Sequence, residues 1–325
     1  MSNRREFITL LGGAAVAWPL AARAQEPGRT YRLGGLTSIP RDAPHYAALF
    51  DELRRLGFTE GQNLTIDWRG YGLPNEQFSA VAAELIKAKV DVIYCAGDFA
   101  IRTAQQATAT IPILAVTDDM VGSGLVRSLA QPGGNTTGVS IFGTELDGKR
   151  QDILIEAVPG LRRLGALADA NSNTPRHLQA LQDAARARGA ELSIYWIAKS
   201  EEIVPAVDAA KKVGAAALNV LSSPLFVANR NIIIGRTATL HLPAIYQWPE
   251  MANEGGLIAY GPRLIQMFRD LGRRQLIKLF RGVKPADLPV EQPTHFELII
   301  NMKTARALGI AVPPTLLARA DEVIE

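Results

Sequence analysis

Cysteine and histidine are scarce in this 325-residue chain, which has one cysteine, Cys95, and four histidines. A single cysteine cannot form an intrachain disulfide, and the apolar run around Cys95 predicts a buried, unreactive thiol. The histidines are scattered, and there is no His-Glu-x-x-His pattern, no Cys/His cluster and no phosphate-binding loop of the Walker type. We therefore expect no metal site, no cofactor and no catalytic residue.

Long apolar runs are also missing beyond the start of the chain, where a membrane-spanning helix would need about 20 residues. The first 24 residues contain Arg4-Arg5, a short apolar stretch and the small-residue site Ala22-Arg23-Ala24, in the order of a signal peptide. The arginine pair resembles a twin-arginine export signal; a general secretory signal and a buried N-terminal helix are the alternatives. We expect cleavage after Ala24, a periplasmic protein and no lipid anchor.

The chain also lacks a strong excess of charge of either sign. Its formal net charge is +3, from 35 basic and 32 acidic residues, and this excess shrinks when the three arginines and one glutamate of residues 1–24 are removed. No stretch of the sequence is basic enough to indicate a nucleic-acid or anionic-lipid surface. We expect neither nucleic acid nor a membrane anchor among its partners.

What the sequence does contain is a regular alternation of short apolar runs and longer helical patterns. The first half predicts strands at residues 31–37, 64–68, 90–95 and 111–116, and helices at 46–56, 77–88, 100–108 and 125–129. After the break at residues 132–135, helices are predicted at 145–157, 176–188, 201–212 and 226–240, and strands at 164–168, 192–197, 216–220 and 244–246. This alternation indicates an α/β protein of two halves, each with a parallel sheet covered on both faces.

Polar groups follow the ends of these predicted strands, which is where ligands bind in open parallel sheets. The candidate hydroxyl, amide and backbone contacts are Thr37, Ser38, Gly97, Asn171 and Ser222. Helix capping is the alternative for these positions. The candidate carboxylates are Asp98, Asp118 and Asp119. Asp118 and Asp119 could also bind a metal ion together. No further carboxylates converge on them in the predicted pattern, so hydrogen bonding to a ligand or helix capping is favoured.

Aromatic residues near strand ends are the third kind of candidate. Tyr246 and Tyr260 stand beside polar loops, where a ring can stack on a ligand, with core packing as the alternative. Together, the candidates predict a small-molecule site between two facing sets of loops.

Six stretches carry a family likeness. They are residues 57–64 (GFTEGQNL), 121–126 (VGSGLV), 132–138 (PGGNTTG), 242–246 (LPAIY), 260–262 (YGP) and 284–294 (KPADLPVEQPT). In these stretches the sequence resembles the substrate-binding proteins of ABC transporters. That family has the type I periplasmic binding protein fold and includes tryptophan-binding members.

The resemblance implies two doubly wound parallel-sheet lobes joined by a hinge of three crossovers, which close on a ligand like a Venus flytrap. Lobe 1 would comprise residues 31–142 and 261–288, and lobe 2 residues 143–260 and 290–325. It also implies a monomer that binds a small amino-acid-like or aromatic molecule and works with the permease subunits of an importer. An exported enzyme and a ligand-sensing receptor domain of the same fold are the alternatives.

This chain departs from the family pattern at three places. It has Gly97-Asp98-Phe99-Ala100 where Gly-Thr-Pro-Ala is common, and a second acid, Asp118, directly before Asp119. Pro249 stands where an arginine is common. These changes remove donors or add negative potential, so we expect a ligand with an amine or several hydrogen-bond donors rather than a simple carboxylate.

Overall fold

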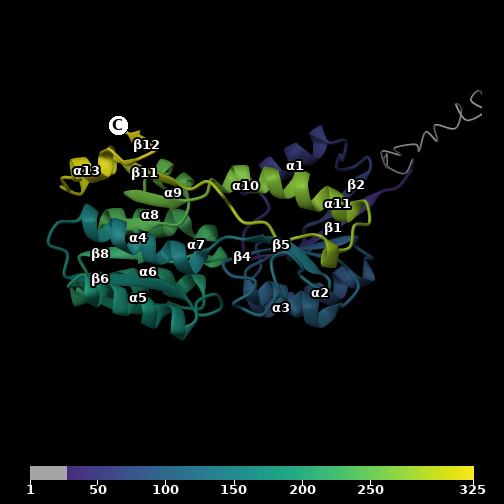
Figure 1. The fold of residues 1–325 in the computed structure, drawn as a ribbon, viewed down its shortest axis with the longest axis horizontal. Helices are drawn as coiled ribbons and strands as arrows, with labels where there is room; N and C mark the ends of the chain where they lie inside the picture. The colour runs from purple at the N-terminus through teal and green to yellow at the C-terminus, as the bar shows by residue number, and fades with distance from the viewer. Residues whose placement is uncertain (1–27) are drawn as a thin grey trace, which may run out of the picture.

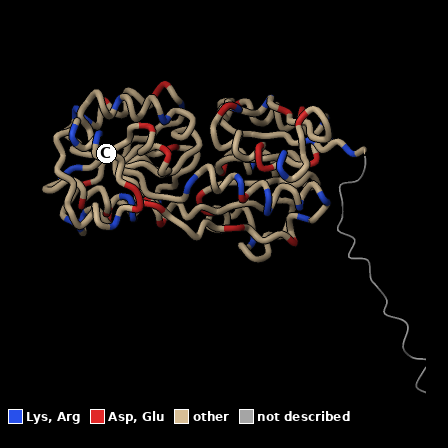
Figure 2. The backbone as a smooth tube through the Cα atoms, turned by 90° about the horizontal axis from the view of Figure 1, so that it is seen from above, with Lys and Arg blue, Asp and Glu red and all other residues tan. Residues whose placement is uncertain are grey.

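A computed structural model describes residues 28–325, which form two lobes lying side by side (Figure 1). The expected signal peptide and its cleavage site lie outside the described residues. None of the helices within residues 28–325 is both long and apolar enough to cross a membrane. Basic and acidic residues are mixed over both lobes (Figure 2), in line with the small net charge of the chain.

The first lobe has a five-stranded parallel sheet with the order β2-β1-β3-β4-β5. Its strands are β1 (Tyr31–Leu36), β2 (Leu64–Asp67), β3 (Val92–Ala96), β4 (Ile113–Thr117) and β5 (Thr136–Ser140). Its helices are α1 (Pro44–Arg55), α2 (Phe78–Lys87) and α3 (Asp98–Ala107), with α10 (Leu264–Leu271) and α11 (Ile277–Phe280) added from late in the chain. All residues of β3 and β4 are buried, because helices cover both faces of the sheet.

The second lobe has a seven-stranded sheet with the order β12-β11-β10-β9-β8-β6-β7. Its strands are β6 (Arg163–Asp169), β7 (Glu191–Ile197), β8 (Ala217–Val220), β9 (Ala244–Tyr246), β10 (Ile258–Gly261), β11 (Glu297–Asn301) and β12 (Glu322–Ile324). Its helices are α4 (Gly143–Ala157), α5 (Pro175–Ala187), α6 (Ile203–Val213), α7 (Pro224–Ala228), α8 (Arg230–Thr239), α9 (Pro249–Asn253), α12 (Met302–Ala307) and α13 (Pro314–Leu317). Only the β10–β11 pair is antiparallel among the described strands.

The chain crosses between the two sheets three times. The first crossing joins β5 to α4, the second joins β10 to α10, and the third leads into β11 (Figure 1). The Val290 N–H donates to the carbonyl of Leu129, and Glu291 forms a bridge with Val139. The third crossing therefore begins after Glu291, whereas the sequence placed residue 290 in the second lobe.

Strand β5 was not among the predicted strands, because its sequence, TTGVS, has no apolar run. Gly138 adopts φ +138° there, and a Cβ at this position would lie 1.9 Å from the carbonyl oxygen of Ala115. The close approach of β4 and β5 thus requires glycine, which sequence patterns read as a strand breaker.

Two predicted helices differ from the structure. Residues 125–129 form bends rather than a helix, since Gly124 has φ +67° and the N–H groups of Leu125 and Val126 share the carbonyl of Met120. The helix predicted at residues 226–240 is instead α7 followed by α8, with a break at Asn229. The side chain of Asn229 donates to the carbonyl of Leu225 at 2.8 Å and helps to end α7.

Candidate functional site in the interlobe cleft

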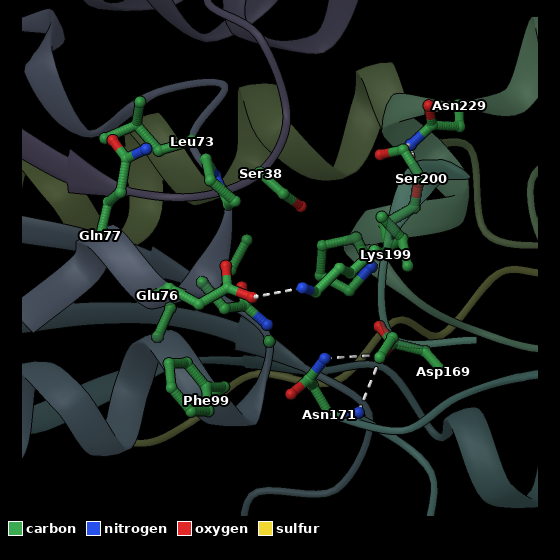
Figure 3. Close-up of a pocket in the computed structure, with 18 of the residues that line it drawn as sticks. Ser38, Leu73, Glu76, Gln77, Phe99, Asp169, Asn171, Lys199, Ser200 and Asn229 are labelled. Atoms are coloured by element: carbon green, nitrogen blue, oxygen red, sulfur yellow. Dashed lines mark hydrogen bonds and ion pairs between the residues drawn. The ribbon is translucent and has the colours of Figure 1, made fainter. Parts of the chain in front are cut away.

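The ends of strands from both lobes face one another across a cleft. The outer part of this cleft is a cavity of about 560 Å³, a size that suits a small organic molecule. First-lobe residues on its wall include Ser38, Glu76 and Phe99, and second-lobe residues include Asp169, Asn171, Lys199 and Asn229 (Figure 3). Gly97 also lines it. The cleft therefore lies where the strand-end rule predicts a ligand site.

Asp169, the last residue of β6, organises the second-lobe wall. Its carboxylate is 3% exposed and accepts hydrogen bonds from the Asn171 N–H (2.8 Å), the Ser172 hydroxyl (3.2 Å) and the Ser223 hydroxyl (2.6 Å). Because these donors come from the loop after β6 and from the start of α7, one carboxylate holds both segments in place.

The mouth of the cleft is open and polar. Glu76 and Lys199 approach to 3.9 Å from opposite lobes (Figure 3), and each side chain is 64% exposed. Such an exposed pair is screened by solvent and contributes little to holding the two lobes together. Phe99, at 41% exposure, supplies an apolar surface at the same cavity.

The inner part of the cleft is small, about 40 Å³, and mostly apolar. At its polar end, Asp118 after β4 accepts a hydrogen bond of 2.5 Å from the hydroxyl of Ser222 in the other lobe. Burial, reinforced by the negative charge of Asp147, raises the pKa of Asp118 to about 7, while the Ser222 hydrogen bond opposes this shift. A carboxyl group that is half protonated near neutral pH thus links the two lobes.

Behind this inner wall, the second lobe holds a buried charged group. Arg150 donates to Asp147 at 2.5 Å and to the carbonyl of Tyr260 at 2.8 Å, and His177 lies 3.1 Å from the other oxygen of Asp147. Arg150 is only 2% exposed and lines neither cavity of the cleft. The described residues contain no cluster of His, Cys, Asp and Glu suited to a metal ion.

Residues 41–324 match the family of proteins described as ABC transporter substrate binding protein. The chain belongs to this family. A tyrosine-binding protein of Clostridioides difficile (strain R20291) is 27% identical over 260 residues, which cover 78% of this chain and 73% of that protein.

Two solved structures have the same fold as this substrate-binding protein. A conserved domain protein from Vibrio cholerae superposes with a TM-score of 0.80 at 22% identity, covering 91% of this chain and 99% of that one. An ABC domain from Streptococcus pneumonia in complex with L-Trp superposes with a TM-score of 0.78 at 23% identity, covering 91% of this chain and 100% of that one. These likenesses establish the two-lobed, type I periplasmic binding protein fold for this family member.

Five of the predicted site residues meet in the cleft of this substrate-binding protein. Ser38, Gly97 and Asn171 line the outer cavity, and Gly97, Asp118 and Ser222 line the inner one. Asp98 lies at the start of α3 beside them, where its carboxylate accepts a hydrogen bond of 2.5 Å from the Thr117 hydroxyl. Asp98 thus holds the ends of β3 and β4 together and does not line either cavity.

Thr37 and Asp119 do not reach the cleft. Thr37 is fully buried, and its hydroxyl oxygen accepts hydrogen bonds from the Tyr46 hydroxyl (3.2 Å) and the Ile39 N–H (3.1 Å). One carboxylate oxygen of Asp119 accepts from the N–H groups of Val121 (3.2 Å) and Gly122 (2.8 Å). Asp119 therefore closes its own turn, and no helix follows it for the carboxylate to cap.

The two candidate tyrosines also lie outside both cleft cavities. Tyr246 is fully buried in the second lobe, with its hydroxyl 2.9 Å from that of Thr237. The ring of Tyr260 packs near that of Phe296, at 6.4 Å between centroids. The expected stacking surface is thus absent at these positions of the described chain, because both rings turn into the lobe rather than toward the cleft.

Some cleft residues were not among the predicted site residues. Asp169 shares its strand-end loop with Asn171, so its position carried a signal that could have identified it. Lys199 follows the end of β7 by two residues, so the strand-end rule could have identified it as well. Glu76 lies in a short helical turn at residues 75–77, which is not directly preceded by a strand end. The place of Glu76 at the cleft follows only from the folded arrangement of the lobes.

Proposed function

We propose that this protein is an exported receptor that captures a small amine-bearing organic molecule between its lobes. We further propose that it hinges at the three crossovers and delivers the ligand to the permease subunits of an ABC importer. The observation that carries the proposal is the direct bond between Asp118 and Ser222 at the base of a cleft lined by both lobes. A ligand that replaces this bond makes contacts with both lobes, and so favours closure.

The charge of the cleft supports an amine as the recognised group. Four carboxylates line the two cavities, and the only cationic side chain among their described residues, Lys199, is paired with Glu76. A ligand ammonium would satisfy Asp118 with a charge-assisted hydrogen bond, whereas an unpaired ligand carboxylate would be repelled. Phe99 and the apolar inner wall suit a flat or aromatic body.

The relatives support an aromatic ligand of this size. One relative is named for tyrosine, and one structure of the same fold was solved with L-Trp. A matched series built on tyrosine separates the ring from its charged groups: tyrosine, tyramine without the carboxylate, and the deaminated acid without the amine. We expect calorimetry to give the tightest binding for tyramine and the weakest for the deaminated acid. Preferred binding of the deaminated acid would contradict the proposed ligand class.

Two neighbouring aspartates provide a matched pair of variants for this site. Asp118→Asn removes the charge that faces the cleft, and should weaken binding of tyramine about tenfold or more. Asp119→Asn changes the next residue, whose carboxylate bonds to its own turn, and should leave the affinity unchanged. Equal effects of the two substitutions would refute the assignment of Asp118 as the amine acceptor.

A further inference from the structure

A second cavity, of about 210 Å³, lies between the lobes beside the inner cleft. Val227, Trp248 and Leu264 line both spaces and form the wall between them. The start of α1, with Pro44 and His45, and the start of α10 close it on the first-lobe side, while α7, α8 and α9 close it on the other. The cavity is therefore formed by both lobes together.

Three residues that line this cavity each have a buried polar atom without a hydrogen-bond partner among the described residues. These atoms are Nε2 of His45, Nε1 of Trp248 and Oε2 of Glu250. His45 is 2% exposed and Trp248 is 5% exposed. Buried polar atoms in native proteins are nearly always hydrogen-bonded, so three unpaired atoms at one cavity indicate that it holds a polar molecule.

The charges around the cavity favour a cation. Arg230 and Glu254 form an ion pair at 2.7 Å. Among the described residues that line the cavity, Glu250 is then the carboxylate that has no ion-pair partner. Its other oxygen, Oε1, accepts from the N–H of Ile265 at 3.2 Å. Burial, with the positive charge of Arg230 nearby, lowers the pKa of His45 to about 3, so the imidazole is neutral and offers no positive charge.

We propose that this cavity is a second solute site, which binds a compact organic cation that also carries a hydroxyl oxygen, such as an amino alcohol. The ammonium donates to Glu250 and to Nε2 of His45, and the hydroxyl oxygen accepts from the indole N–H of Trp248. The apolar part packs on Val227, Met251 and Leu264, which line the same space. This proposal does not rest on the ligand assigned above to the main cleft.

The indole N–H of Trp248 is a direct reporter for this site. In ¹⁵N-labelled protein, Trp248→Phe assigns its resonance among the tryptophans. The probes are leucinol, its neutral diol analogue and the hydroxy acid analogue of leucine, which share a branched apolar body and differ in charge. We expect leucinol to shift the Trp248 resonance and to bind at least tenfold more tightly than the diol, with no shift from the hydroxy acid. A cavity that holds water only would give no shift with any probe and would overturn the proposal.

Substitutions then locate the binding. Glu250→Gln should weaken leucinol binding about tenfold or more, as expected for the loss of a charge-assisted hydrogen bond. Asp118→Asn, which alters the main cleft, should leave the leucinol titration unchanged. The reverse pattern would place leucinol in the main cleft and refute the second site. If Glu250→Gln does not fold, as judged by its thermal unfolding, His45→Phe tests the same contact, and undiminished binding of leucinol to it would likewise refute the site.

Discussion

Asp118 combines two roles at the level of a single residue. Its carboxyl group bonds to Ser222 across the cleft and also lies against the first residue of α4, since a Cβ on Gly143 would be 2.3 Å from its Cγ. The group is therefore enclosed by the loop after β4, the start of α4 and the loop after β8 in the other lobe. This enclosure removes water and explains why its neutral form is favoured.

The pKa of Asp118 makes stability depend on pH. The value is raised from 3.8 to about 7, so between these pH values the folded protein retains a proton that the unfolded chain has released. The contribution of this group to the free energy of unfolding therefore falls as pH rises through that window, and its unfavourable effect is complete above it. Asp118→Asn stays neutral and should flatten this part of the pH profile in denaturant unfolding. Asp119→Asn should retain the parent slope; an unchanged slope in Asp118→Asn would contradict the prediction.

Tyr246 provides a contrasting test, since the structure places it in the core rather than in the cleft. Tyr246→Phe removes the hydroxyl that lies 2.9 Å from that of Thr237 and keeps the buried ring. We expect a loss of about 1 kcal/mol in the free energy of unfolding, the usual value for one buried hydrogen bond. Ligand affinity should not change. A clear loss of affinity in a fully folded Tyr246→Phe variant would indicate that Tyr246 contacts the ligand after all.

At the level of elements, apolar runs were enough to predict most of the secondary structure. Strands β3 and β4 are continuous apolar segments buried on both faces, and such segments are conspicuous in a sequence. Strand β5 was missed because its packing depends on a glycine that approaches Ala115, a contact between segments. Late strands β11 and β12 were not predicted either, since they form in a tail whose pattern does not continue the βα alternation.

The site was predictable only in part, for a related reason. A strand end fixes where a loop lies, which is why Ser38, Gly97 and Ser222 were found. It does not fix where a side chain points. Neighbouring Asp118 and Asp119 follow the same strand, yet one bonds to the other lobe and the second bonds to its own backbone.

Gly97, at the junction between β3 and α3, lies where the two lobes approach each other closely. It has φ +83°, and a Cβ there would lie 3.0 Å from Cγ of Pro224 in the opposite lobe. Gly97→Ala should therefore weaken ligand binding by obstructing closure, in addition to straining the backbone. Gly61 has φ +81° and open space around it, so Gly61→Ala carries the backbone strain alone. Calorimetry should show reduced affinity only for Gly97→Ala. Equal affinities of the two variants would show that a methyl group at residue 97 does not obstruct closure.

For the whole molecule, export is a separate prediction from the fold. Because Ala22-Arg23-Ala24 provides the small residues of a cleavage site, the mature protein should begin at Gln25. N-terminal sequencing of protein recovered from the periplasm measures this directly. The double substitution Arg4→Lys and Arg5→Lys in the leader keeps both positive charges, so it should reduce export by a twin-arginine route and leave a general secretory route active. A protein that stays in the cytoplasm and retains residues 1–24 would contradict the prediction.

The two lobes should also change their separation when the ligand binds. The contacts between them around the cleft include the Asp118–Ser222 hydrogen bond, the packing of Gly97 near Pro224 and the exposed Glu76–Lys199 pair. Such contacts allow open and closed forms to interconvert, and a ligand that touches both lobes shifts the population toward the closed form. Small-angle scattering should therefore show a smaller radius of gyration with saturating tyramine than without it. Gly97→Ala should show a smaller decrease than Gly61→Ala at the same occupancy, because both carry backbone strain but only the methyl group at residue 97 lies against the opposite lobe. An identical radius with and without bound ligand in the parent protein would rule out closure as the response to binding.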